Sequence, residues 1–402
     1  MGARRIVSLV FFWQLAASVC YYTIFAATPF FRDEFALSGA QVGLVLTALS
    51  LGYATFLLPL GAMTDRFGER KMLTIGLIGL SVGSVVVAGA WSYPSLLVGT
   101  FLLGSMYGTA MPGTNKAIFD SIPAGRQNIA VGIKQVGVTA GSGVSALLVT
   151  GIAGVLYWQA GFYVAAGGGI VVAALFWIVY RDAGGTGTAG YPDFRGLAGN
   201  KPYRSLTVAG VFLGAGLFTT TGYTIIYMNE SVGATVAYGG VVLAAIQVSG
   251  SVGRVVTGWL SDILPGDPRQ RIGAILLIQA AASVILFVAV ALVETTFLAA
   301  VVFVVLGFFA LGFTGIYYSC MATLVSVEEM GSATGGGQLA LVAGALVAPP
   351  AFGYLADTVG YWASWGMLAT LSLLATGFIL RVIVLEPPVG TEMAASTAST
   401  ED

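Results

Sequence analysis

The chain has 402 residues, of which 57% are hydrophobic and only 9% are charged, and its formal net charge at pH 7 is −1. Because soluble globular domains carry roughly 25% charged residues, this composition excludes a water-soluble enzyme or binding domain. The small net charge gives no sign of a nucleic-acid partner, and we expect none. The absence of histidine excludes histidine-based metal sites and proton relays.

Apolar runs long enough to cross a bilayer follow one another along the chain. About 20 apolar residues cross the hydrocarbon core as one helix, whose backbone groups are bonded within the segment. In the first half the predicted spans lie near residues 6–28, 40–62, 72–91, 95–118, 129–151 and 158–180. In the second half they lie near residues 205–228, 238–260, 272–293, 296–320, 333–356 and 362–384. The sequence therefore predicts an all-α membrane protein with twelve transmembrane helices.

A polar stretch divides these spans into two groups of six. Residues 1–180 are predicted to form an N-terminal six-helix bundle, and residues 205–385 a C-terminal six-helix bundle. Residues 181–204 between them are rich in glycine and contain two prolines, which predicts a cytoplasmic linker that is flexible. The tail at 386–402, made of Ser, Thr, Ala and acidic residues, is predicted to be disordered and cytoplasmic.

Basic residues are distributed unequally between the two sides of the predicted membrane. With the N-terminus placed in the cytoplasm, all but four of the 17 basic residues fall on the cytoplasmic side. Arg32 falls outside, and Lys116, Lys134 and Arg254 fall within spans. Because loops rich in Lys and Arg stay in the cytoplasm, both termini are predicted to be cytoplasmic. We expect a multi-pass protein of a prokaryotic cell membrane, in contact with lipid and monomeric.

The two halves of the chain repeat each other weakly. Offsets of 197 and 203 residues align glycine, aspartate and glutamine at equivalent places of the spans. The aligned pairs are Gly61 with Gly258, Asp65 with Asp262, and Gln135 with Gln338. Parallel six-helix halves with a central site between them are a known architecture of transporters.

The loop after the second span carries the most specific motif, GAMTDRFGERK at residues 61–71. It resembles the signature loop of the major facilitator superfamily, in which a glycine, Asp-Arg and a second glycine precede basic residues. Similar patterns at residues 253–262 and 112–126 extend this resemblance over nearly the whole chain. Glu69 departs from the family pattern, which usually has a basic residue there.

The resemblance implies a gate at the cytoplasmic face. Asp65 would latch onto the partial positive charge at the start of span eleven, and Asp262 onto the start of span five. A basic loop residue would also reach Asp120, and Glu69 leaves open whether this is Arg66, Arg70 or Lys71. The alternative is a short loop that serves topology and solubility alone. The predicted gating residues are Gly61, Asp65, Arg66, Arg70, Asp120, Gly258 and Asp262.

Three cations inside the predicted spans, Lys116, Lys134 and Arg254, point to the substrate. A cation at the bilayer centre costs about 2.5–3.5 kcal/mol, and no Asp or Glu lies deep within any predicted span. Together the three cations are expected to attract an anion. The alternatives are that the long side chains snorkel to the interface, or that Lys116 pairs with Asp120 one helical turn away.

The resemblance points to the same substrate class. Arg254 is similar to the substrate-binding arginine of monocarboxylate transporters and oxalate–formate exchangers, and Asn115-Lys116 is similar to the Asn-Arg pair of organic-anion symporters. Oxalate–formate exchangers carry a lysine in span eleven, where this chain has Gln338. The predicted substrate-binding residues are Arg254, Lys116, Lys134, Gln135, Gln338, Asn115, Tyr21, Tyr223 and Gln247. Further candidates are Gln14, Tyr22, Tyr317 and Tyr318.

The sequence therefore predicts a transporter, not an enzyme, that carries a small mono- or dicarboxylate by alternating access and needs no cofactor. Its transport is secondary active or facilitative, and inorganic anions such as nitrate are a further option. The alternative is a proton-coupled exporter of hydrophobic compounds, which would favour a buried carboxylate and a Gly-Pro signature in span five. A receptor or membrane enzyme is disfavoured because no nucleophile–base pair, metal cluster or phosphate loop is recognisable.

Overall fold

The computed structural model describes residues 3–123, 127–181, 194–326 and 329–385, apart from the side chain of residue 128. Within these ranges every regular element is an α-helix, which confirms the predicted all-α fold. The predicted tail at 386–402 and residues 182–193 of the predicted linker lie outside the described residues.

The helices follow the predicted spans closely. The first half contains α1 (Ala3–Glu34), α2 (Gly39–Phe67), α3 (Glu69–Ala88), α4 (Tyr93–Tyr107), α5 (Ala110–Ser121), α6 (Gln127–Ala153) and α7 (Trp158–Val179). The short α8 (Arg195–Ala198) precedes α9 (Lys201–Glu230), α10 (Val236–Ile263), α11 (Pro268–Leu292), α12 (Thr296–Ala310), α13 (Thr314–Ala322), α14 (Met330–Thr358) and α15 (Tyr361–Val384). Eleven described stretches are long and apolar enough to cross a membrane, and α4 with α5 makes the twelfth.

Two spans are broken, which the sequence did not predict because the apolar runs continue through both breaks. Span ten is interrupted between α12 and α13, where a Cβ on Gly312 would meet the Phe308 carbonyl and lie 3.1 Å from the Cα of Gly253. The two glycines therefore let α10 approach the break closely. Span four is interrupted at Gly108 and Thr109, between α4 and α5.

Local capping explains several helix boundaries. The Ser38 hydroxyl accepts a hydrogen bond from the Gln41 amide at 3.2 Å, while the Gln41 side chain accepts one from the Ser38 amide at 2.8 Å. This capping box starts α2. At α11 the Asp267 side chain accepts from the amide of Gln270 at 2.9 Å, and Pro268 occupies the first turn.

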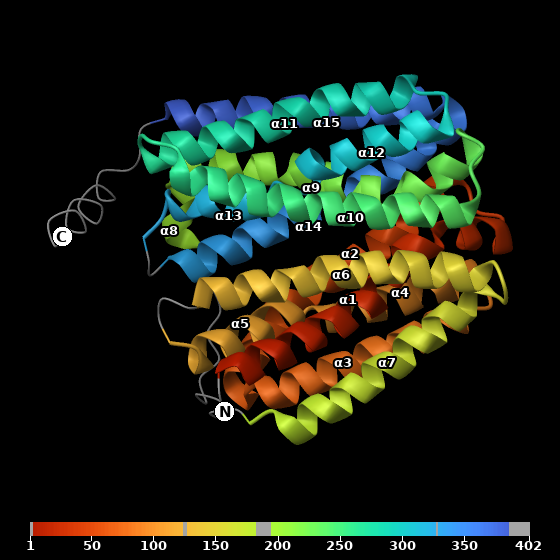
Figure 1. Cartoon of the computed structure of the whole chain (residues 1–402), viewed down its shortest axis with the longest axis horizontal. Coiled ribbons are helices and arrows are strands. Elements are labelled where there is room, and N and C mark those ends of the chain that lie inside the picture. The colour runs from red at the N-terminus through yellow and green to blue at the C-terminus, as the bar shows by residue number, and fades with distance from the viewer. Residues whose placement is uncertain (1–2, 124–126, 182–193, 327–328, 386–402) are drawn as a thin grey trace, which may run out of the picture.

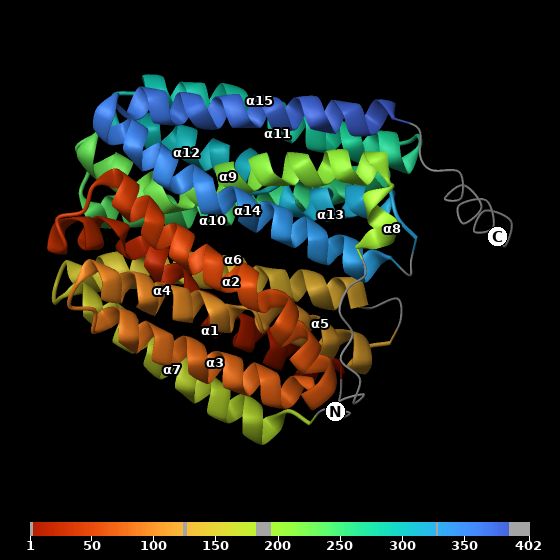
Figure 2. The ribbon, with the colours of Figure 1, turned by 180° about the vertical axis from the view of Figure 1, so that it is seen from behind.

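The helices form two groups, α1–α7 and α9–α15, which occupy the lower and upper parts of Figure 1. The chain begins at the same end of the molecule at which α7 ends and α9 starts, as both views show (Figures 1 and 2). We call this the basic end, because it carries Arg66, Arg70, Lys71, Arg269 and Arg271. The opposite end, at which α1 and α9 finish, is called the far end.

The two groups touch toward the far end. In the crossing of α2 and α14, Gly43 faces the backbone of Pro349 and Pro350 with no room for a Cβ. The Thr28 hydroxyl of α1 donates to the carbonyl of Gly222 in α9 at 2.9 Å. A third contact joins α6 to α10. The helix pairs α2–α14, α1–α9 and α6–α10 therefore close the space between the two groups at the far end.

Candidate functional site

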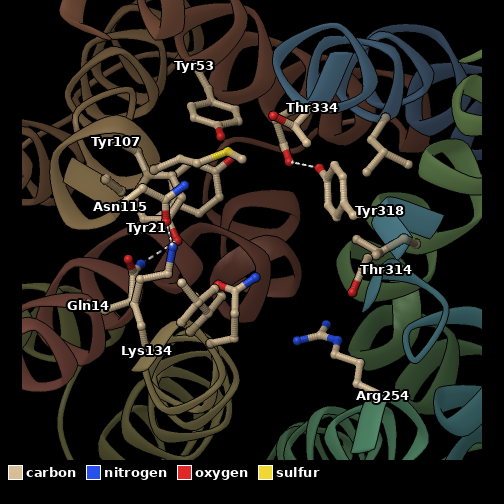
Figure 3. A pocket seen from close by; sticks show the side chains of 18 of the residues that line it. Gln14, Tyr21, Tyr53, Tyr107, Asn115, Lys134, Arg254, Thr314, Tyr318 and Thr334 are labelled. Atoms are coloured by element: carbon tan, nitrogen blue, oxygen red, sulfur yellow. Dashed lines mark hydrogen bonds between the residues drawn. The ribbon is translucent and has the colours of Figure 1, made fainter. Parts of the chain in front are cut away.

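A cavity of about 520 Å³ lies between the two helix groups (Figure 3). Its wall comes from α1, α2, α4, α5 and α6 on one side and from α9, α10, α13 and α14 on the other. Phe119, Val131 and Met330, from the basic-end turns of α5, α6 and α14, belong to the wall. The cavity therefore extends toward the basic end, whereas the helix contacts described above close it toward the far end.

Arg254 supplies the cation of the second helix group. It lies on α10, next to Gly253, and points into the cavity (Figure 3). Its Nη2 donates to the carbonyl of Leu311 at 3.2 Å, with Nε at 3.4 Å from the same oxygen. Leu311 follows directly after α12, where the break ends the regular hydrogen-bonding pattern. The broken span thus provides the acceptor that orients the guanidinium.

Lys134 supplies the cation of the first group. The side chain lies on α6, is only 4% exposed, and its Nζ donates to Oδ1 of Asn115 on α5 at 2.6 Å. Beside it, the Gln14 amide donates to the Tyr107 hydroxyl at 3.2 Å, and the ring of Tyr107 stacks on Tyr21 with centroids 4.1 Å apart. On the side of the first helix group, the cavity wall therefore consists of amide, phenol and ammonium groups that hold one another in place.

The cavity has an excess of positive charge. Lys134 and Arg254 are the two charged residues among the described side chains that line it, and these include no Asp or Glu. No described carboxylate forms an ion pair with either of them. Since cations in a low-dielectric wall are costly without counter-charges, the site is built to receive negative charge.

Most of the predicted binding residues meet in this cavity. Besides the two cations, the wall contains Asn115, Gln135, Gln247, Gln338, Tyr21, Gln14, Tyr22 and Tyr318. Lys116 instead pairs with Asp120 at 2.7 Å, and neither residue belongs to the wall. Tyr223 lies in the far-end contact, with its hydroxyl 2.7 Å from the Gly39 carbonyl, and Tyr317 is buried against α14.

Sequence reasoning missed several residues of the wall, among them Tyr53, Tyr107 and Phe218. The Tyr53 and Tyr107 rings lie 5.6 Å apart, and Phe218 stacks on Phe25 at 6.4 Å. Aromatic side chains in spans are common as packing residues, so no motif marks these three. Tyr107 lies directly before the break in span four, but that break is not visible in the sequence, so it gave no signal either.

The first turn of α3 is bound to the C-terminal end of α7. Glu69, the departure from the family pattern, is buried and accepts a hydrogen bond from the Tyr180 hydroxyl at 2.9 Å. The Arg70 guanidinium lies 4.2 Å from the Trp177 ring centroid and donates to the Trp177 carbonyl. Arg70 therefore reaches α7, whereas the basic partner of Asp120 is Lys116.

The remaining gating residues lie at the basic end. A Cβ on Gly61 would make ordinary contacts with Pro112 at 3.6 Å, and a Cβ on Gly258 would meet open space. The Arg66 guanidinium lies 5.1 Å from the ring centroid of its neighbour Phe67. The predicted latches of Asp65 and Asp262 stay predictions.

An ionic cluster at the far end was not predicted. Arg32 of α1 binds Glu230 of α9 through Nε at 3.0 Å and Asp357 of α14 through Nη2 at 2.9 Å. Asp357 also accepts a hydrogen bond from the amide of Gly39 at the start of α2, and Glu230 accepts one from the Tyr361 hydroxyl at 2.7 Å. The cluster joins the two helix groups on the side where the cavity is closed.

Comparisons with known proteins bear on the family and the fold of the chain. A sequence profile described as Major Facilitator Superfamily matches residues 10–340. The chain is 24% identical to the hexuronate transporter of Bacillus subtilis (strain 168) over 98% of each chain, and 27% identical to a probable sulfoacetate transporter of Cupriavidus necator over 91% of each. It is 24% identical to the D-galactonate transporter of Escherichia coli O6:H1, covering 95% of this chain and 96% of the relative.

Among solved structures, a bacterial homologue of the human lysosomal transporter Spinster, in an inward-facing and occupied conformation, has a TM-score of 0.77. The alignment covers 94% of this chain and 96% of that chain, at 18% identity. At this identity the likeness concerns the fold.

Proposed function

The chain belongs to the Major Facilitator Superfamily, and we propose that it carries a small organic anion across the membrane by alternating access. The observation that carries this proposal is the pair of cations, Lys134 and Arg254, in a cavity whose described wall contains no acid. The relatives named above carry organic acids, which supports the same substrate class. Like them, the chain is a transporter and not an enzyme.

Arg254 is suited to hold a carboxylate. Its planar guanidinium donates two parallel hydrogen bonds to one acid group, a geometry that an ammonium cannot match. The Leu311 carbonyl fixes one side of the guanidinium, so the remaining donors are oriented before the anion arrives. A substrate bound here supplies the negative charge that the wall lacks.

The closed far end and the cavity that extends to the basic end support alternating access. In our proposal residues 1–180 and 205–385 rock as two bundles around the bound anion. The basic residues support placing the basic end, with both termini, in the cytoplasm, so this conformation faces inward. Closing the basic end would form the latches of Asp65 and Asp262. Opening the far end must break the ionic cluster that Arg32 forms there with Glu230 and Asp357.

Exchange or facilitated diffusion is the favoured mode of transport. The described wall of the cavity offers no carboxylate that could carry a proton alongside the substrate. This also disfavours the alternative of a proton-coupled exporter, which would need such a group. Counterflow, in which anion inside the vesicle drives uptake of labelled anion, is the matching assay.

The proposal is tested with purified protein in liposomes preloaded with unlabelled organic acids. We expect saturable counterflow of at least one labelled acid from a panel of hexuronate, galactonate, short and long dicarboxylates, and aromatic acids. Lipophilic cations are expected to show no protein-dependent movement. If folded protein moves lipophilic cations and none of the acids, the anion proposal is wrong and the exporter alternative replaces it.

Replacing Lys116 by glutamine is expected to change the uptake rate less than about twofold. The Lys116–Asp120 pair lies outside the cavity wall, and an i,i+4 ion pair of this kind contributes only about 0.3–0.5 kcal/mol. The initial rate of counterflow, normalised to reconstituted protein, measures the effect. A loss of uptake beyond tenfold would show that Lys116 acts in the substrate path after all.

A further inference from the structure

Two lysines on adjacent helices of the first group have chemically different partners. Lys116 binds the carboxylate of Asp120 at 2.7 Å, whereas Lys134 binds the neutral amide oxygen of Asn115 at 2.6 Å. The first pair carries no net charge. The second leaves the positive charge of Lys134 on the cavity wall, because an amide oxygen accepts a hydrogen bond without neutralising the ammonium.

Arg254 contributes the second charge from the opposite side of the cavity (Figure 3). Its acceptor among the described residues is the backbone carbonyl of Leu311, which is also neutral. An ammonium has three donors and a guanidinium five, so both groups keep donors for a ligand after these contacts. The described wall therefore carries two positive charges, one from each helix group.

From this charge count we infer that the substrate is a dianion, an organic molecule with two acid groups, and that Lys134 serves this specificity because its partner Asn115 is neutral. One acid group binds Arg254 and the other binds Lys134, so the substrate spans the two helix groups. A monoanion would leave one of the two cations without a counter-charge, so we expect a monoanion to bind more weakly than a dianion. The inference rests on the proposed anion transport and adds the number of charges.

The shape of the cavity fits a carbon skeleton between the acid groups. Its volume of about 520 Å³ lies within the range of sites for molecules of several carbons. The wall of the cavity also includes the rings of Tyr21 and Phe218 and the side chain of Leu217. Such a wall suits an apolar chain or ring that separates two acids.

The decisive variant is Asn115→Asp, which changes the charge of the partner of Lys134 while keeping its shape. The new carboxylate would pair with the ammonium as Asp120 pairs with Lys116, and the cavity would keep one net positive charge. Lys134→Gln gives the cavity the same net charge by removing the ammonium itself. Asn115→Ala is the matched control, because it removes the amide and leaves the positive charge.

The test compares dianions with monoanions of equal length in counterflow at pH 7.5, using succinate against butyrate, adipate against hexanoate, and terephthalate against 4-methylbenzoate. We expect the unchanged protein to prefer the dianion of at least one pair by tenfold or more. Asn115→Asp and Lys134→Gln are expected to reverse this preference, with dianion uptake falling at least tenfold and monoanion uptake retained. Asn115→Ala is expected to keep the dianion preference.

The outcomes separate the two proposals. Equal or better transport of monoanions by the unchanged protein would overturn the dianion inference and leave anion transport standing. An unaltered preference in both folded charge variants would overturn the role of Asn115 and Lys134. Failure of every organic acid would remove the proposed function itself. If Asn115→Asp does not elute as a monodisperse protein in detergent, Lys134→Gln alone decides.

Discussion

Replacing Arg254 by glutamine is expected to lower counterflow of the transported acid by at least about 30-fold. Truncating one partner of a buried charge pair costs about 2–5 kcal/mol, and about 1.4 kcal/mol corresponds to each factor of ten. Glutamine keeps a donor near the Leu311 carbonyl but removes the charge and the parallel pair of hydrogen bonds. The effect is measured as the initial rate of counterflow and as the affinity for labelled acid, both on the same preparation.

Two further variants separate binding from folding in this experiment. Arg254→Lys restores a point charge without the planar fork, so we expect it to recover only part of the affinity. Arg381 lies exposed on α15, and Arg381→Gln removes the same charge outside the cavity with little expected effect. Uptake by Arg254→Gln within threefold of the unchanged protein would show that the arginine holds no substrate.

Hydropathy predicted the twelve spans because a helix in lipid must bond its own backbone, so a long apolar run leaves few alternatives. The helix ends were harder to predict. Span one was expected to stop near residue 28, but α1 continues to Glu34 because Arg32 and Glu34 are bound by other helices. The two breaks were invisible for another reason, since a close approach such as that of Gly253 to Gly312 depends on a distant helix.

The clearest part of the site in the sequence was its charged residues. A lysine or arginine in an apolar span is conspicuous, and this marked both Lys134 and Arg254. Hydropathy alone marked Lys116 as well, but its i,i+4 spacing to Asp120 indicated the alternative of an ion pair, which the structure shows. Arg32, Glu230 and Asp357 each resemble an ordinary charge at a helix end, and they are far apart in sequence. Their cluster exists only in the tertiary arrangement.

The far-end cluster holds together the two helix groups at the side from which the cavity is closed. Its arginine is about one-fifth exposed, with side-chain exposure of 22%, so its ion pairs are screened less than pairs at an open surface. Breaking the cluster leaves Glu230 and Asp357 without their shared cation. It also removes the support that Arg32 gives to the hydrogen bond between Asp357 and the Gly39 amide at the start of α2. Arg32 is therefore expected to stabilise the conformation that is closed at the far end.

Replacing Arg32 by glutamine is expected to raise far-end opening on the order of tenfold, since a coupling of about 1–3 kcal/mol changes populations by 5–150-fold. Thr221, a buried residue of the cavity wall one position before Gly222, becomes the reporter in the variant Thr221→Cys. We expect a membrane-impermeant thiol reagent, added from the far side of the membrane, to label this cysteine faster when Arg32 is replaced. Cys20 and Cys320 are buried, and the chain without the reporter measures their background.

The matched control for this experiment is Glu34→Gln. It removes a charge from the same end of α1, but the Glu34 carboxylate binds Trp158 and Gln159 of α7, within its own helix group. Far-end labelling is therefore expected to stay unchanged in Glu34→Gln. Equal labelling rates in the Arg32 variant and the control would show that the helix crossings of α2 with α14 and of α1 with α9 close the far end without help from the ion pairs. Faster labelling confined to the Arg32 variant would mean that Arg32 must release both Glu230 and Asp357 each time the cavity opens to the far side.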